Sequence, residues 1–170
     1  KITSTLQCII KWGCDGSSGQ SQCKQKFSDD GSSDSNIFLT SLVPLQIVGI
    51  DNEKKKQIIV WKNPRPSSAR FCRPIKLQFL HGTVKSTRDE ERYISSQIDT
   101  LIPYECITDG KKVLISYEMY FTMIDGKVAN AVTDTKSAMR CHLCKATSKE
   151  LNNIDKMQER KIEKRSLKFG

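Results

Sequence analysis

Two aspartates in this sequence share a local pattern, in which an acid and a glycine end a long apolar segment. Asp15 follows LQCIIKWGC, and Asp125 follows KKVLISYEMYFTMI. Both segments alternate apolar residues at period 2, so each aspartate is predicted to lie at the carboxyl end of a strand. If the two strands are neighbours in one sheet, the paired carboxylates would bind Mg²⁺ or Mn²⁺, which prefer oxygen ligands.

A pair of divalent ions held in this way activates an attacking oxygen and stabilises a leaving oxygen during phosphoryl displacement. An Asp-Gly pair is also ordinary turn chemistry, so each aspartate has a purely structural interpretation. Spacing alone does not choose between a metal site and two unrelated turns.

A second candidate site is the motif CHLC, in which Cys141 and Cys144 have the spacing of half a zinc site. The sequence has no second close pair of ligands, although His81 and Cys106 are further candidates. Two alternatives stay open, namely cysteines that are merely buried and a redox pair that forms a reversible disulfide. The other five cysteines are scattered, which indicates a reducing compartment.

The composition indicates a basic globular protein with a polyanionic partner. The 170 residues include 28 Lys and Arg against 19 Asp and Glu, which gives a net charge of +9. Nucleic acid is the commonest partner for such a balance. No apolar run is long enough for a membrane helix, so we expect no membrane partner, and no signal peptide is visible. The chain begins at a lysine, so we expect a fragment of a longer protein.

Several elements must position these residues. Residues 37–50 and 57–61 predict a hairpin, with a bulge, an edge or a break at Pro44. The proline-rich stretch 62–74 is predicted to be extended and irregular. A short strand is predicted at 75–79. A helix follows, with a capping box at Thr87 and Glu90, and it ends at Pro103. After a DG turn, a strand is predicted at 111–124. Short helix 127–132 and a helix from Thr147 to about 168 complete the chain.

Whole phrases of the sequence resemble Transib-type DNA transposases and, more distantly, the catalytic core of the V(D)J recombination-activating recombinase. The phrases span most of the chain in one order. They are KWGCDGSSGQSQCKQKF (11–27), NIFLTSLVPLQ (36–46), WKNPRPSSARFCRPIKLQF (61–79), FTMIDGKVANAV (121–132) and CHLCKATSKELNN (141–153).

The resemblance implies an α/β, RNase H-like fold whose first three strands are antiparallel and whose fourth is parallel to the first, with flanking helices. It maps two of three catalytic, metal-binding carboxylates onto Asp15 and Asp125, and zinc-binding cysteines onto Cys141 and Cys144. Residues 1–140 would be the first part of the catalytic domain, and 141–170 the start of a truncated zinc-binding helical insertion. The implied cofactors are two Mg²⁺ or Mn²⁺ ions and a structural Zn²⁺.

The implied activity is DNA strand cleavage and strand transfer at transposon terminal repeats and target DNA, by a nuclear protein that is a homodimer at full length. Basic residues predicted to contact DNA are Lys24, Lys26, Arg65, Arg70 and Arg73.

This chain departs from the family in one large respect. The family's catalytic glutamate and its histidine zinc ligands lie downstream, so we expect the fold to be incomplete at its C-terminus and this chain alone not to cleave DNA. A transposon-derived scaffold that binds DNA without cutting it is the alternative function.

Overall fold

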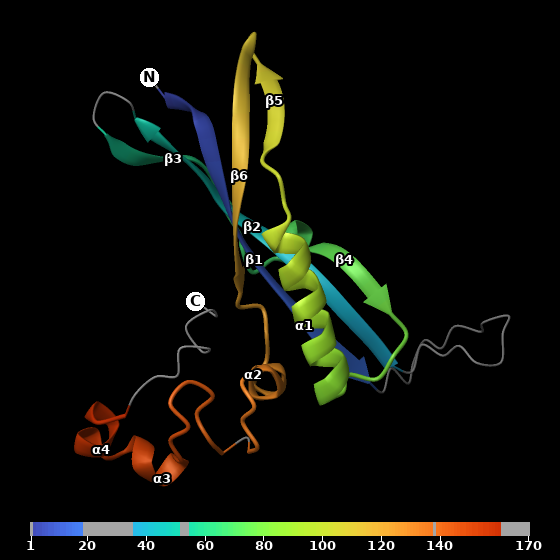
Figure 1. The fold of residues 1–170 in the computed structure, drawn as a ribbon, viewed down its shortest axis with the longest axis vertical. Helices are drawn as coiled ribbons and strands as arrows, with labels where there is room; N and C mark the ends of the chain where they lie inside the picture. The colour runs from blue at the N-terminus through green and yellow to red at the C-terminus, as the bar shows by residue number, and fades with distance from the viewer. Residues whose placement is uncertain (1, 19–35, 52–54, 138, 161–170) are drawn as a thin grey trace, which may run out of the picture.

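A mixed sheet of six strands forms the larger part of the molecule, the longest helix lies against one half of it, and the C-terminal helices lie beyond its end (Figure 1). The computed structural model describes residues 2–18, 36–51, 55–137 and 139–160. The main path of the sheet follows the order β3-β2-β1-β6-β5, and β4 also pairs with β2. The α/β class and the mixed sheet predicted from the sequence are therefore confirmed.

The first three strands are antiparallel, as predicted. Strand β1 (Ile2–Ser18) pairs with β2 (Asn36–Asp51), which pairs with β3 (Lys56–Lys62). The register shifts at Pro44, because Ile9 pairs with Gln46 and Ile10 with Pro44. Leu45 is therefore the extra residue of a bulge, which the proline predicted. The side chain of buried Asn63 donates to the Pro44 carbonyl, and its backbone N–H donates to the Leu45 carbonyl, both at 2.8 Å.

The proline-rich stretch leads into β4 (Arg73–Gln78), which pairs antiparallel with the first half of β2. The stretch is irregular, as predicted, except for a 3₁₀ turn, η1 (Ala69–Phe71), that the sequence analysis did not anticipate. The hydroxyl of Ser68 accepts from the Arg70 N–H at 3.3 Å and begins this turn.

Strand β6 (Lys111–Phe121) lies parallel to β1, and β5 (Tyr104–Thr108) pairs antiparallel with β6. The sequence analysis missed β5, which is short and mostly exposed. The Asp109-Gly110 turn joins the two strands with positive φ at both residues, as hairpin turns of this kind require. The parallel partner of β1 is therefore the sixth strand of the chain, which corrects the expected fourth, because β4 and β5 come before it.

Helix α1 (Val84–Asp99) begins earlier than predicted. Its cap is Thr83, which forms a capping box with Ser86, so the predicted box at Thr87 and Glu90 is wrong. Glu90 is instead buried against the sheet, where it accepts from the Thr40 hydroxyl. The helix also ends at Asp99, before Pro103.

Three short helices follow β6: α2 (Gly126–Val132), α3 (Ser148–Leu151) and α4 (Ile154–Gln158). The short helix after Asp125 is confirmed. The single helix predicted from Thr147 is wrong, because Asn153 interrupts it and accepts from the Lys156 N–H as the cap of α4. The predicted continuation to residue 168 lies outside the described residues.

The core lies where α1 and α2 cover the carboxyl-terminal half of β1. Its buried members are Trp12, Cys14, Phe38, Ile94, Phe121 and Val128. The rings of Trp12 and Phe121 pack with centroids 4.4 Å apart, which joins the two parallel strands where their pairing ends. In the described part of the chain, no helix has the length and apolar character to cross a membrane.

Candidate functional site

Asp15 lies within β1, which corrects the expectation that it follows the strand. Strand β1 continues to Ser18 because β2 stays beside it, and Asp15 is opposite Leu39. The parallel pairing of β1 with β6 nevertheless ends at Trp12 and Phe121. Asp15 is therefore just beyond the end of the parallel pair, on an exposed stretch of strand.

A backbone contact joins this part of β1 to the segment before Asp125. The Met123 N–H donates to the Trp12 carbonyl at 3.0 Å, and a Cβ added to Gly13 would lie 1.8 Å from the Met123 carbonyl oxygen. Only glycine allows this approach. Because side chains two apart on a strand share a face, Asp15 projects to the same face as this contact. Asp15 and Asp125 each follow the contact by two residues, and we call this region (residues 13–16 and 123–127) the aspartate edge.

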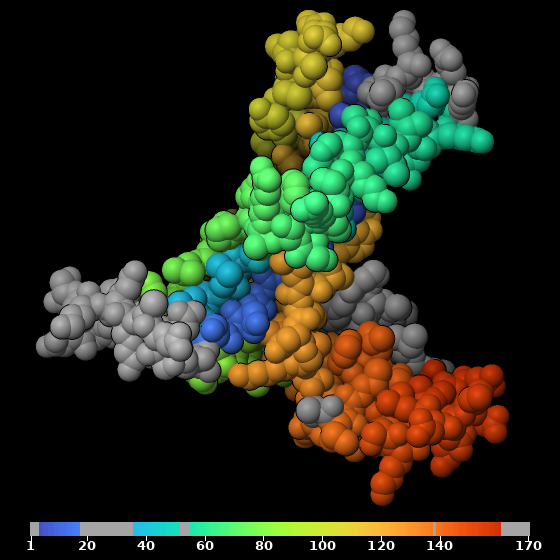
Figure 2. Space-filling model, turned by 180° about the vertical axis from the view of Figure 1, so that it is seen from behind, coloured from blue at the N-terminus to red at the C-terminus, as the bar shows by residue number. Residues whose placement is uncertain are grey.

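Two further contacts tie the aspartate edge to the loop before α1. A Cβ added to Gly16 would lie 2.9 Å from the Cα of Gly82, and the Lys127 ammonium group is 3.4 Å from the Gly82 carbonyl. Seen from behind, the blue end of β1 lies beside the orange segment that follows β6 (Figure 2). The two strand ends therefore meet at one place in the fold.

Asp125 is the N-cap of α2. Its Oδ1 accepts from the Val128 N–H at 2.7 Å, which is ordinary structural work for an aspartate at this position. The bond also fixes the orientation of the carboxylate. An ionised carboxylate has about four acceptor positions, so this hydrogen bond leaves capacity for a cation.

Buried charge supports the aspartate edge from the α1 side. Glu90 accepts from the Thr40 hydroxyl at 2.7 Å and forms an ion pair with Lys76 at 2.5 Å. Burial, followed by the charges of Glu90, Asp15 and Glu91, raises the pKa of the Cys14 thiol to about 12. Cys14 is therefore a neutral core residue. This network was not predicted, because Glu90 was assigned to a capping box, although its spacing from Ile94 and Ile98 puts it on the buried face of α1.

Two carboxylates, Asp15 and Asp125, lie at the aspartate edge. Within the described residues, no group of three His, Cys, Asp or Glu side chains is arranged to hold a metal ion. The donor chemistry of Asp15 and Asp125 fits Mg²⁺ or Mn²⁺, because both are exposed carboxylates at one edge of a sheet.

The predicted DNA-contacting residues do not all fall in the described structure. Lys24 and Lys26 lie outside it. Arg65, Arg70 and Arg73 are exposed near η1, and Arg73 donates to the Arg70 carbonyl at 2.8 Å. Strand β2 lies between β4, which begins at Arg73, and β1, so the structure does not bring these arginines to the aspartates.

The motif CHLC forms a tight loop, which we call the CHLC loop (residues 140–147). Arg140 and Thr147 form an antiparallel bridge, the Cys141 N–H donates to the Ala146 carbonyl, and the Lys145 N–H donates to the Cys141 carbonyl. Lys145 has a φ of 59°, so the chain reverses in a left-handed residue just after the second cysteine.

Hydrogen bonds converge on Cys141 within this loop. Burial raises the pKa of the Cys141 thiol. The N–H groups of Cys144 and Leu143 and the charge of Lys145 together lower it by more, so the net shift of the pKa is downward. Both cysteines are free thiols. Because thiolates are the ligands that Zn²⁺ takes from cysteine, the pair fits half of a tetrahedral zinc site. His81 and Cys106 lie on the loop before α1 and on β5, and the structure does not bring either to this pair.

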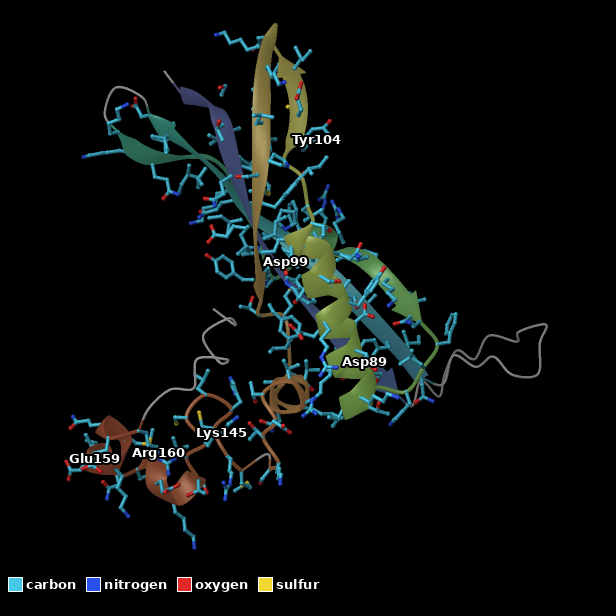
Figure 3. All side chains as sticks on the ribbon, viewed as in Figure 1. Asp89, Asp99, Tyr104, Lys145, Glu159 and Arg160 are labelled. Carbon is cyan, nitrogen blue, oxygen red and sulfur yellow. The ribbon has the colours of Figure 1, made fainter. Side chains whose placement is uncertain are left out.

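Lys145 joins the CHLC loop to the end of α2. Its ammonium group donates to the Thr133 carbonyl and to the Thr135 hydroxyl, both at 2.7 Å. On the other side, Arg160 donates to the Cys144 carbonyl at 3.0 Å and pairs with Glu150 at 2.5 Å. Figure 3 shows Lys145 and Arg160 together in the C-terminal part, far from Tyr104. The loop is therefore fastened to the helix that Asp125 caps.

Comparison with known proteins adds no assignment, since no protein-family model and no curated protein matches the chain.

Proposed function

We propose that this chain is the first part of a DNA transposase catalytic core with an RNase H-like fold. The observation that carries the proposal is the contact between Gly13 and Met123, which puts Asp15 and Asp125 at one edge beyond the parallel strands β1 and β6. The resemblance to Transib-type transposases assigns the same two residues, and it adds the substrate, DNA.

In this proposal Asp15 and Asp125 would hold the divalent cations that neutralise a DNA phosphate at the aspartate edge. Bound Mg²⁺ or Mn²⁺ would supply activation of an attacking oxygen and stabilisation of a leaving oxygen. The hydrogen bond from the Val128 N–H keeps the Asp125 carboxylate oriented before any ligand arrives. Cys141 and Cys144 would hold a structural Zn²⁺ with ligands from elsewhere in the longer protein. A third carboxylate is required for cleavage, so this chain alone is proposed to be inactive.

The test is cleavage of terminal-repeat DNA by the longer parent protein with Mg²⁺ or Mn²⁺. Asp15→Asn and Asp125→Asn are expected to abolish cleavage while leaving the protein folded, because each removes a charged metal ligand. Asp109→Asn is the matched control, since the residue lies in the β5–β6 turn and asparagine tolerates its positive φ. Undiminished cleavage by both site variants would exclude the assignment.

The alternative function is a transposon-derived scaffold that binds DNA and zinc without cleaving. The parent sequence separates the two: a downstream glutamate with a histidine pair favours the enzyme, and their absence favours the scaffold. Zinc analysis of purified protein tests both against a redox role for Cys141 and Cys144, which requires a reversible disulfide and no bound metal.

A further inference from the structure

Two adjoining cavities form one groove along α2. The first, about 590 Å³, lies between the start of α1 and α2, and the second, about 510 Å³, lies between residues 134–137 and the CHLC loop. Residues 134–137 line both cavities, so the two adjoin at this segment. We call the two cavities together the α2 groove; Gly126, next to Asp125, lines the first, and Arg140 and Lys145 line the second.

The α2 groove carries a surplus of positive charge. Its basic residues are Arg88, Lys127, Lys136, Arg140 and Lys145, and its one acid is Asp134. Asp134 is already neutralised, because its carboxylate accepts from Arg88 at 2.8 Å. The hydrogen bond and charge of Arg88, assisted by Lys136 and Lys145, lower the pKa of Asp134. The local field therefore favours an anion.

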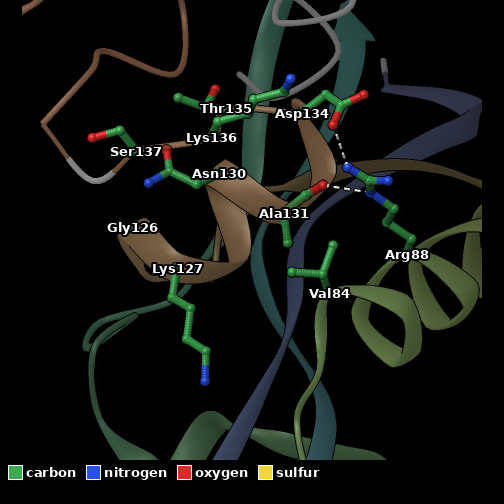
Figure 4. A pocket seen from close by; sticks show the side chains of 10 residues that line it. All are labelled: Val84, Arg88, Gly126, Lys127, Asn130, Ala131, Asp134, Thr135, Lys136 and Ser137. Atoms are coloured by element: carbon green, nitrogen blue, oxygen red, sulfur yellow. Dashed lines mark hydrogen bonds and ion pairs between the residues drawn. The ribbon is translucent and has the colours of Figure 1, made fainter.

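The basic residues divide into two roles. Arg88 donates to the Ala131 carbonyl at 2.6 Å as well as to Asp134, and Lys145 donates to the end of α2. These two side chains therefore have a structural role in the lining of the groove. Figure 4 shows Arg88 reaching from α1 to the end of α2, while Lys127 extends from the first turn of α2. Lys127, Lys136 and Arg140 are exposed, and no ion pair within the described residues ties them to an acid.

We infer that the α2 groove binds the phosphate backbone of DNA, with Lys127, Lys136 and Arg140 contacting successive phosphates. This inference rests on the proposed function, because the groove begins at Gly126, beside the carboxylate proposed to hold the cations at the reacting phosphate. Exposed cations spaced along a groove suit a linear polyanion better than a small anion, for which the charges would converge on one point. The three residues are distinct from Arg65, Arg70 and Arg73.

The experiment measures DNA binding by this chain in EDTA, so that no divalent cation bridges the aspartates to the DNA. A fluorescent oligonucleotide duplex is titrated at several salt concentrations with the wild type and with the variant Lys127→Met, Lys136→Met, Arg140→Met. We expect the variant to bind about tenfold more weakly or worse, and the slope of log K against log salt to fall by roughly two to three, since each phosphate contact contributes about 0.9.

The matched control is Lys56→Met, Lys62→Met, Lys111→Met, which removes the same charge from exposed positions on β3 and β6. The control is expected to keep most of the affinity and slope. An equal loss in both variants or an unchanged slope in the groove variant would overturn the inference. If the triple variant fails to fold, Lys136→Met and Arg140→Met are tested singly, since neither side chain makes a hydrogen bond among the described residues.

Asp15→Asn and Asp125→Asn separate this inference from the proposed function. Both variants are expected to bind DNA in EDTA at least as tightly as the wild type. If the parent protein does not cleave DNA, the catalytic proposal is wrong. The comparison of the groove variant with its control still shows whether DNA binds in the α2 groove.

Discussion

The aspartate edge and the CHLC loop are held in place by different means. At the aspartate edge, β1, Met123 and Gly82 meet through backbone atoms, and glycines make the approach possible. At the CHLC loop, long charged side chains reach backbone carbonyls: Lys145 reaches from the loop to Thr133, and Arg160 reaches into the loop to Cys144. Where two backbone segments are in contact, an added side-chain atom can be accommodated only if a strand moves. Where a side-chain hydrogen bond is lost, the surrounding chain can adjust. The first region is therefore expected to be intolerant of substitution and the second to be adjustable.

The largest effect is expected at Gly13. Alanine there would place its Cβ 1.8 Å from the Met123 carbonyl oxygen, so one of the two strands must move. We expect Gly13→Ala to lower the free energy of unfolding by about 3 kcal/mol or more, at or beyond the usual range for overpacking. Denaturant unfolding followed by circular dichroism measures this.

The control for Gly13 is Gly126→Ala on the same edge. A Cβ at Gly126 meets nothing within 4 Å, and alanine is the better helix former in α2. This variant is expected to be neutral or to gain up to about 1 kcal/mol. Similar losses for the two variants would show that the edge is sensitive to any change and that the backbone contact is not the cause.

The sequence predicted strands β1 and β6 and an irregularity at Pro44, because period-2 alternation and proline act locally, but it placed Asp15 beyond the end of β1, which continues to Ser18. It did not predict the contact of Gly13 with Met123, since that contact depends on which strands become neighbours. The cap of α1 was misplaced for a related reason: Thr87 and Glu90 have the spacing of a capping box, but Glu90 turns inward to Thr40 and Lys76. Tertiary contacts outweighed a local pattern there.

The C-terminal part shows the opposite limit. The capping box at Thr147 and Glu150 and the pair Cys141 and Cys144 are local patterns, and the structure contains the box and the tight loop. The link through Lys145 to Thr133 is long-range and has no sequence signal beyond a lysine. The strand β5 was missed because its residues are mostly exposed and too few to show a clear alternation.

A smaller effect is expected at Lys145. Lys145→Met keeps the stem but removes both hydrogen bonds to the end of α2, and we expect a loss of about 1 to 2 kcal/mol. Amide hydrogen exchange should show faster exchange in α2, and added Zn²⁺ should protect α2 in the wild type but not in the variant. Lys149→Met, at an exposed position on α3, is the matched control. If Zn²⁺ protects α2 equally in Lys145→Met and in Lys149→Met, Lys145 does not couple the loop to the helix.

The smallest effect is the titration of Glu150. The N–H and hydroxyl of Thr147, then Arg160, lower the pKa of this carboxyl from 4.5 to about 2. A carboxyl whose pKa is lower in the folded state stabilises that state above its unfolded pKa, and the contribution is lost as the pH falls through the folded value. The capping box of α3 should therefore hold at pH 5 and weaken progressively between about 4.5 and 2. NMR titration of the Thr147 amide measures it.

Two variants rank the causes of that shift. Thr147→Val removes the hydroxyl but keeps the N–H, and Arg160→Met removes a hydrogen bond and a charge, so each should raise the midpoint of the Glu150 titration. Lys156→Met, on exposed α4, should leave the midpoint unchanged. A larger rise with Arg160→Met would mean that the ion pair contributes more than the Thr147 hydroxyl to keeping Glu150 ionised. The CHLC loop would then depend on Arg160 for both Glu150 and the Cys144 carbonyl, and the adjustability inferred for this region would be limited to its Lys145 side.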